Sequence, residues 1–217
     1  MAVFLLVAIV CAFGLLGRGS PAELWSARGT ILLCVNLFLL LLCISPVFGF
    51  IHRLVFARYW LFPLLDGEWD AQIHSNWPRI RKTYEAAKSD AMKFDAMTDG
   101  LDSADEATRT TRASVTIKSH LFSISIRLEP EDSNRVSCTR FVRPRWIKDE
   151  TPELFYVYEQ TDADPVALTD VPEHLGAGRL RYDVEKDQLI GQYWTQRSEK
   201  AGFNTAGRIV LTRRPTY

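Results

Sequence analysis

Aromatic, hydroxyl and guanidinium side chains share one face of a predicted β-strand near the C-terminus. Tyr193, Thr195 and Arg197 occupy alternate positions of the segment 189–197, and neighbours on a strand point to opposite faces. An arginine binds phosphate bidentately, and an aromatic ring stacks on a nucleobase. The series therefore predicts one wall of a nucleotide pocket. Since Tyr and Thr also favour strands that bind nothing, an ordinary solvated face stays open as the alternative.

Two other strands and one tryptophan extend this chemistry. Ser125 and Arg127 fall on one face of a second predicted strand, and Tyr158 shares a face with Tyr156 on a third. Trp77 lies at the end of the first strand beside a proline, where stacking on a ligand and core packing are equally open to it. The predicted ligand-binding residues are Trp77, Ser125, Arg127, Tyr158, Tyr193, Thr195 and Arg197.

The sequence offers little support for catalysis or metal binding. His74-Ser75 and Ser119-His120 are adjacent pairs, but their side chains point to opposite faces of a strand and cannot form a nucleophile–base couple. The 4 cysteines and 4 histidines lack metal-ligand spacing. With 26 basic and 26 acidic residues, the chain lacks the positive charge that a nucleic-acid polymer requires. We therefore predict a binding protein without catalytic residues, metal, cofactor, or a DNA or RNA partner.

The first fifty residues differ sharply in composition from the rest. Positions 31–51 contain no charged residue, and a helix of that length matches the roughly 30 Å hydrocarbon core of a bilayer. Positions 2–17 are also uncharged. We predict two transmembrane helices, at about 2–17 and 31–51 within residues 1–53, followed by a juxtamembrane linker at 54–66. The alternative for the first segment is a cleaved signal peptide, although no basic residue precedes it.

The orientation in the membrane is only weakly indicated. Arginines flank the second predicted span on both sides, so the distribution of positive charge decides nothing. An even number of spans places both termini on the same side. Cys138 is the only cysteine after the spans, which rules out a disulfide within that part and favours a reducing compartment.

Residues 67–217 read as one β-domain. After a turn at Asp66-Gly67, a strand with period-two alternation runs as far as Asn76-Trp77-Pro78, followed by a helix within 79–97 and a loop at 98–112. Since the connections between later strands are mostly of hairpin length, we expect a closed up-and-down antiparallel barrel of about eight strands rather than a sandwich. The later strands are predicted at 114–128 (a hairpin or one bent strand), 135–142, 154–160, 178–184, 189–197 and 207–213.

The chain resembles a family of bacterial antiphage proteins. Two apolar segments precede Gly67-Glu-Trp69 and Ser75-Asn-Trp77-Pro78. Near the C-terminus follow His174-Leu-Gly176 and the motif LIGQYWTQR at 189–197. This combination is similar to the effectors of cyclic-oligonucleotide-based antiphage signalling (CBASS) that have two transmembrane helices and a β-rich domain, while positions 84–169 match more loosely.

The resemblance implies a fold and a function. It implies a lipocalin-like barrel that binds a cyclic dinucleotide made by a partner nucleotidyltransferase during phage infection. Ligand binding then promotes homo-oligomerisation, and the spans disrupt the bacterial inner membrane and kill the infected cell. The β-domain is expected in the cytoplasm.

Two other functions stay open on the sequence alone. A membrane-tethered, lipocalin-like barrel can carry a lipid or another hydrophobic ligand, which predicts an aliphatic interior. Alternatively, the domain is a structural assembly module, which predicts a filled core without a pocket.

Overall fold

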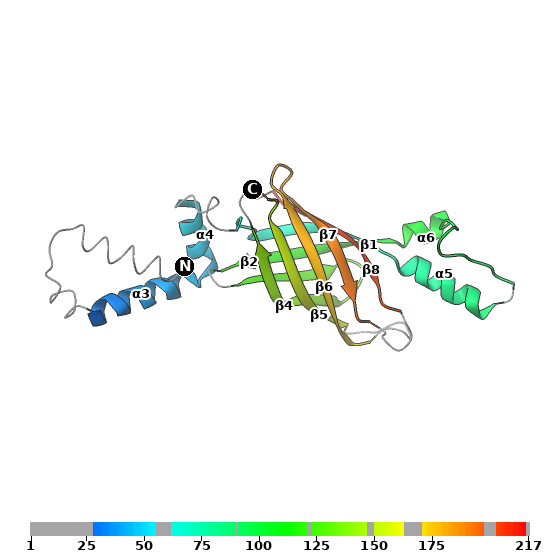
Figure 1. Cartoon of the computed structure of the whole chain (residues 1–217), viewed down its shortest axis with the longest axis horizontal. Coiled ribbons are helices and arrows are strands. Elements are labelled where there is room, and N and C mark those ends of the chain that lie inside the picture. Colours follow the sequence, from blue (N-terminus) through cyan, green and yellow to red (C-terminus); the bar gives the residue numbers. More distant parts are fainter. Residues whose placement is uncertain are drawn as a thin grey trace. The chain divides into compact units, whose positions relative to one another are not determined.

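The computed structural model describes residues 28–54, 62–89, 91–120, 123–146, 150–162, 171–197 and 203–215 (Figure 1). These residues divide into two compact units. The first ends at Ile51 and also includes His120, and the second begins at His52 and contains the β-domain.

Two helices occupy the described part of the apolar N-terminal segment. They are α3 (Arg28–Leu42) and α4 (Ser45–Leu54). Pro46 has no N–H to donate to the carbonyl four residues back, so helical hydrogen bonding is interrupted beside it. The predicted span at 31–51 is thus divided between two helices rather than continuous.

The structure does not confirm the two predicted transmembrane helices. Within the described residues, no one helix is both long enough and apolar enough to cross a bilayer. Val35–Leu42 and Pro46–Arg53 meet both requirements only as a pair, bent by 101°. The other predicted span, at 2–17, lies outside the described residues.

Eight antiparallel strands form a closed barrel, in which each strand pairs with the next along the chain and β1 pairs with β8 (Figure 1). The predicted up-and-down barrel is confirmed. The strands are β1 (Gly67–Ser75), β2 (Thr110–Ser119), β3 (Ile124–Pro130), β4 (Arg135–Arg145), β5 (Glu153–Asp162), β6 (Glu173–Asp183), β7 (Gln188–Thr195) and β8 (Ala206–Arg213).

The connection from β1 to β2 differs from the prediction. Its first helix is α5 (Trp77–Lys88), which starts earlier than expected because Pro78 suits the first turn of a helix. The expected loop at 98–112 contains a second helix, α6 (Ser103–Ala107). Asp102 caps α6 by accepting a hydrogen bond from the Asp105 backbone N–H at 2.8 Å.

Ion pairs hold α6 to α5. The Asp105 carboxylate is buried and accepts from Arg81 and, at 2.5 Å, from Lys82. Lys82 also pairs with Asp102 at 2.8 Å, and these hydrogen bonds hold the Asp102 carboxyl at a pKa of about 2. These charged side chains follow no apolar periodicity in the sequence, and in the structure they join α5 to α6.

One end of the barrel is filled by side chains. Trp69 is fully buried there, and its Nε1 donates to the Leu65 carbonyl at 3.0 Å. The Arg213 guanidinium carbon lies 4.3 Å from the centre of the indole, and Tyr182 packs against the same ring edge-on. Further fully buried side chains of this end are Val115, Ile117, Leu154 and Leu189. Free volume inside the barrel is thereby left to the opposite end.

A β-bulge in β4 changes which side chains face inward. Thr139 is paired with Tyr158 and Phe141 with Val157, so Arg140 is one extra residue on β4. Side chains two apart on a regular strand share a face. The extra residue reverses this relation, so that Thr139 lines the interior while Phe141 is 56% exposed on the outside.

Gly191 should be intolerant of any side chain. A methyl group there would lie 1.8 Å from the Arg179 carbonyl oxygen of the neighbouring strand, and backbone cannot rotate away as a side chain can. We expect Gly191→Ala to lower the free energy of unfolding by about 3 kcal/mol, the upper end of overpacking costs. Thermal unfolding of the full chain in detergent measures the change.

Gly100→Ala is the matched control, because no atom lies within 4 Å of the added methyl group. It should leave the melting temperature within about 1 °C, as expected for surface changes below about 0.5 kcal/mol. Equal melting temperatures for the two variants would contradict the close approach of β7 to β6.

Candidate functional site

A cavity of about 220 Å³ lies inside the end of the barrel opposite Trp69. All eight strands contribute side chains to it, together with Trp77 at the start of α5. Its apolar wall is formed by Ile73, Ile126, Leu128, Pro130, Leu180, Ile209 and Leu211. The barrel thus encloses a space with an apolar lining on one part of its wall.

The rest of the lining is polar, and hydroxyl groups are its most frequent feature. Gln160 and the buried His174 add an amide and an imidazole. Among the described residues that line the cavity, none is an aspartate, glutamate or lysine. The hydroxyls come from Ser75, Thr108, Thr111, Ser133, Ser137, Thr139, Tyr156, Tyr158, Tyr193, Thr195 and Thr205.

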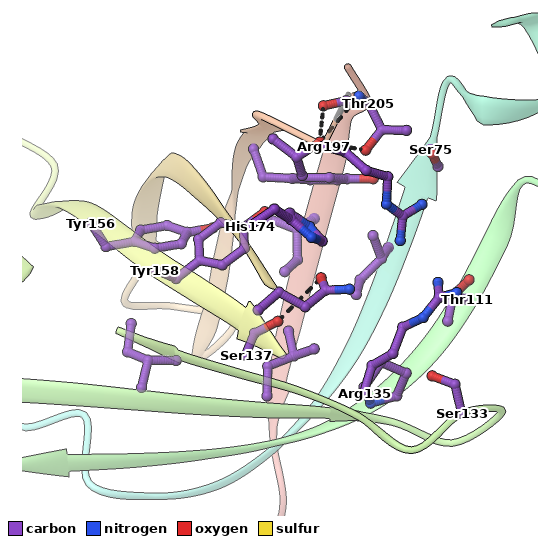
Figure 2. A pocket seen from close by; sticks show the side chains of 18 of the residues that line it. Ser75, Thr111, Ser133, Arg135, Ser137, Tyr156, Tyr158, His174, Arg197 and Thr205 are labelled. Atoms are coloured by element: carbon purple, nitrogen blue, oxygen red, sulfur yellow. Dashed lines mark hydrogen bonds between the residues drawn. The ribbon is translucent and has the colours of Figure 1, made fainter. Parts of the chain in front are cut away.

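Two arginines supply positive charge to the cavity. Arg135 is the first residue of β4, and Arg197 follows β7 by two residues. Figure 2 shows their guanidinium groups directed toward each other from different sides of the cavity. Arg135 Nε also pairs with the buried Asp162 carboxylate at 2.7 Å, which fixes one edge of its guanidinium. An anion between the two arginines would meet cations from both sides.

A cross-strand glycine sets the position of each of two neighbouring tyrosines. Tyr156 is paired with Gly178, and Tyr158 with Gly176. A methyl group on Gly176 would lie 2.3 Å from Tyr158 Cζ, and one on Gly178 would lie 2.4 Å from Tyr156 Cζ. The two rings therefore occupy space that only glycine leaves, with centroids 5.9 Å apart.

The three cavity tyrosines stay protonated well above neutral pH. Burial is the main cause that raises the pKa of Tyr156, Tyr158 and Tyr193 above the ordinary phenol value. The pKa of Tyr158 rises further through its neighbours Tyr156 and Tyr193. Each phenol can therefore donate a hydrogen bond to a ligand oxygen at physiological pH.

Hydrogen bonds join the two ends of the connection that carries Arg197. Thr195 Oγ1 lies 2.8 Å from Thr205 Oγ1 and 3.1 Å from the Thr205 backbone nitrogen, which donates to it. The Gln196 N–H donates to the Leu175 carbonyl at 2.8 Å. These contacts extend the strand pairing past the end of β7 and direct Arg197 toward the cavity.

Five of the seven sequence-predicted binding residues line this cavity: Trp77, Tyr158, Tyr193, Thr195 and Arg197. The other two, Ser125 and Arg127, do not line it. Both are exposed, and Arg127 pairs with Glu129 on the outside of the barrel at 2.6 Å. The reason is that β3 directs its apolar residues inward, so its polar alternate positions face solvent.

Several lining residues were not among the predicted set, and the most consequential is Arg135. Arg135 directly follows a turn, so its position alone does not indicate a binding role. Arg135, Ser137 and Thr139 nevertheless form the same kind of alternating polar series as the one near the C-terminus. His174 precedes the strand predicted at 178–184, but β6 begins at Glu173 and makes it a buried strand residue. Within the described ranges, no group of three His, Cys, Asp or Glu side chains is arranged to bind a metal.

The arrangement suits a ligand that has both anionic and aromatic parts. Arginines and neutral hydroxyl donors bind phosphate oxygens, while Trp77 and the tyrosines offer ring faces and edges. Trp77 is itself held by Phe203 at a centroid distance of 6.3 Å, and Phe203 also packs edge-on against Tyr84 of α5.

Known proteins share this domain. Residues 94–213, more than half of the chain, match the family model described as "Cap15, cyclic dinucleotide receptor domain". CD-NTase-associated protein 15 of Escherichia albertii is 36% identical over 67 residues, covering 30% of this chain and 34% of that relative. The match thus spans about a third of the relative's length. It agrees with the resemblance to the CBASS effectors, and the chain belongs to the Cap15 cyclic dinucleotide receptor family.

Proposed function

We propose that this protein is a CBASS effector whose barrel binds a cyclic dinucleotide in the cavity between Arg135 and Arg197. The observation that carries the proposal is the joint presence of two arginines and three neutral tyrosines in one cavity of a Cap15-family domain. A cyclic dinucleotide has two phosphates and two bases, so the two arginines match its charges. The aromatic side chains match its bases, with Trp77, Tyr158 and Tyr193 as ring contacts and Thr195 as a hydroxyl donor.

The cavity lining weighs against the two other functions. A carrier of lipid would need an aliphatic interior, but hydroxyl-bearing residues and the two arginines outnumber the aliphatic residues in this lining. A purely structural module would need a filled core, and this barrel is filled only at the Trp69 end. Nothing in the lining suggests a catalytic couple, and we propose a sensor rather than an enzyme.

We further propose how sensing leads to an effect. The apolar N-terminal segment anchors the protein in the bacterial inner membrane with the barrel in the cytoplasm. Ligand binding drives homo-oligomerisation, and the assembled apolar segments disrupt the membrane and kill the infected cell. The exposed leucines of α3 support this step, because five of them and Ile44 present apolar surface: Leu32, Leu33, Leu37, Leu40 and Leu41.

Arg197→Ala should weaken cyclic dinucleotide binding about 100-fold, because a charge-assisted hydrogen bond contributes up to about 3 kcal/mol. The measurement is calorimetric titration of the full chain in detergent with cyclic di-AMP, cyclic di-GMP, cyclic di-UMP, cyclic GMP–AMP and cyclic UMP–AMP. Linear dinucleotides of the same bases should fail to bind the wild type. Arg135→Lys keeps a cation beside Asp162 and should weaken binding about tenfold through loss of bidentate geometry.

Arg127→Ala is the matched control, since this arginine lies outside the cavity. It should bind as the wild type does. Unchanged affinity in Arg197→Ala, or a loss in Arg127→Ala as large as in Arg197→Ala, would place the phosphate site elsewhere. Failure of the folded wild type to bind any cyclic dinucleotide would remove the proposed function itself.

Affinity should be constant from pH 7 to pH 9. The pKa values of the three cavity tyrosines are raised, so their phenols keep the donor proton throughout this range and lose it only at higher pH. The same titration at intervals of pH checks this. A progressive loss of affinity between pH 8 and pH 9 would show that a phenol with a lowered pKa contacts the ligand.

Asn36→Leu should reduce killing without changing ligand affinity. An amide within an apolar helix hydrogen-bonds between helices and contributes about 0.6–2 kcal/mol to their association. Growth of cells expressing the variant together with the partner nucleotidyltransferase reports killing, and titration reports affinity. Unaltered killing would show that Asn36 has no part in helix association.

A further inference from the structure

The outer wall of the barrel carries an apolar row that crosses four strands. Phe141 is paired with Val157, Val157 with Ala177, and Ala177 with Trp194. Phe141, Val157 and Trp194 are 56%, 37% and 52% exposed. Phe141, Val157, Ala177 and Trp194 are called the apolar row below. Phe155 and Leu175 widen it on either side, and contiguous apolar surface of this kind marks a site of association.

The chain forms this row by two departures from ordinary patterning. The Arg140 bulge turns Phe141 outward, although Thr139 lines the cavity. At the end of β7, Tyr193 and Thr195 face inward, which leaves Trp194 outside between them. The large apolar side chains of Phe141 and Trp194 are therefore exposed to solvent, which disfavours the single barrel.

The two sides of the row differ in charge. Toward the Trp69 end, the next register row holds Arg143, Phe155 and Arg179. The row after it adds Arg145 and Arg181 around the buried Glu153, so arginines outnumber carboxylates on this side.

On the other side lie Glu159 and Glu173, which share a hydrogen bond. Arg140 pairs with Glu159 there at 2.6 Å through Nε, and Arg127, in the same register row, pairs with Glu129. These two guanidinium groups each have a carboxylate partner, so this side lacks the excess positive charge of the arginine-rich side.

We propose that the apolar row is the surface through which two copies of this chain pair, with a twofold axis running along the row. This inference deepens the proposed function and rests on it. That axis places the arginine side of one copy against the glutamate side of the other, whereas an axis along the strands would place arginines against arginines. Glu159 of one copy then faces Phe155 of the other, between Arg143 and Arg179.

The same strands connect this surface to the cavity. Val157 lies between Tyr156 and Tyr158, and Ala177 lies between Gly176 and Gly178. A ligand that contacts the inner rings therefore acts on the residues directly beside the apolar row. The row itself is short, about 14 Å across four strands spaced about 4.8 Å apart. So small a surface suits weak pairing that becomes stable when ligand favours it.

Val157→Glu and Trp194→Glu should each raise the protein concentration for half-maximal pairing at least tenfold. Sedimentation of the full chain in detergent, with and without the five cyclic dinucleotides named above, measures this. Val184→Glu is the matched control, because Val184 is 63% exposed in the turn after β6 and lies off the row. It should pair as the wild type does.

Charge reversal tests the direction of the axis. Arg143→Glu should weaken pairing, and adding Glu159→Arg in the same chain should restore it. Stronger pairing in Arg143→Glu alone would overturn the proposed axis, because it would mean that arginines oppose one another.

Ligand titration of the same samples separates this inference from the proposed function. A wild type that binds nucleotide yet stays monomeric at every concentration overturns the pairing surface and leaves sensing intact. Pairing that is equally strong in Val157→Glu, Trp194→Glu and the control also overturns it. Pairing lost in the two row variants, while the unpaired chain still binds nucleotide, supports it.

Discussion

Closure of the sheet by the pairing of β1 with β8 is the constraint on which the rest of the molecule depends. Once the barrel is closed, every inward position belongs to one enclosed volume, and side chains must either fill it or leave a cavity. Trp69, held by Leu65 and Arg213, fills one end. The opposite end receives shorter hydroxyl side chains and two arginines, whose long stems leave space between them.

Successive side chains of each strand point alternately into the barrel and out of it, so each strand contributes to both surfaces. On β5 the inward rings of Tyr156 and Tyr158 alternate with outward Val157, and on β7 inward Tyr193 is followed by outward Trp194. Gly176 and Gly178 leave no space between β6 and the two tyrosine rings. A displacement of either ring is therefore transmitted to the strand backbone, which also holds the outer side chains.

Period-two alternation was sufficient to predict the barrel and most of one cavity wall, but it could not say which face of a strand turns inward. The series of Arg127 and Ser125 looks like that of Arg197 and Thr195, yet only the second faces the cavity. On β3 the aliphatic residues occupy the other face and turn inward, whereas on β7 the fully buried Leu189 shares the face of Tyr193 and Thr195. The α5–α6 ion pairs depend on contacts between residues far apart in the sequence, whereas the break in the predicted span follows from Pro46 itself.

Ligand-driven pairing, as proposed, requires the cavity to bind ligand more tightly in the paired barrel than in the single one. A ligand shifts an equilibrium only as far as its affinities for the two states differ, and each factor of ten corresponds to about 1.4 kcal/mol. A cavity already shaped perfectly in the single barrel would give no such difference. Tyr156 and Tyr158 line the cavity from the same strand that carries Val157 of the apolar row. Under the proposed pairing, contacts of the ligand with these two rings and contacts between two copies act on this one strand, so each can favour the other.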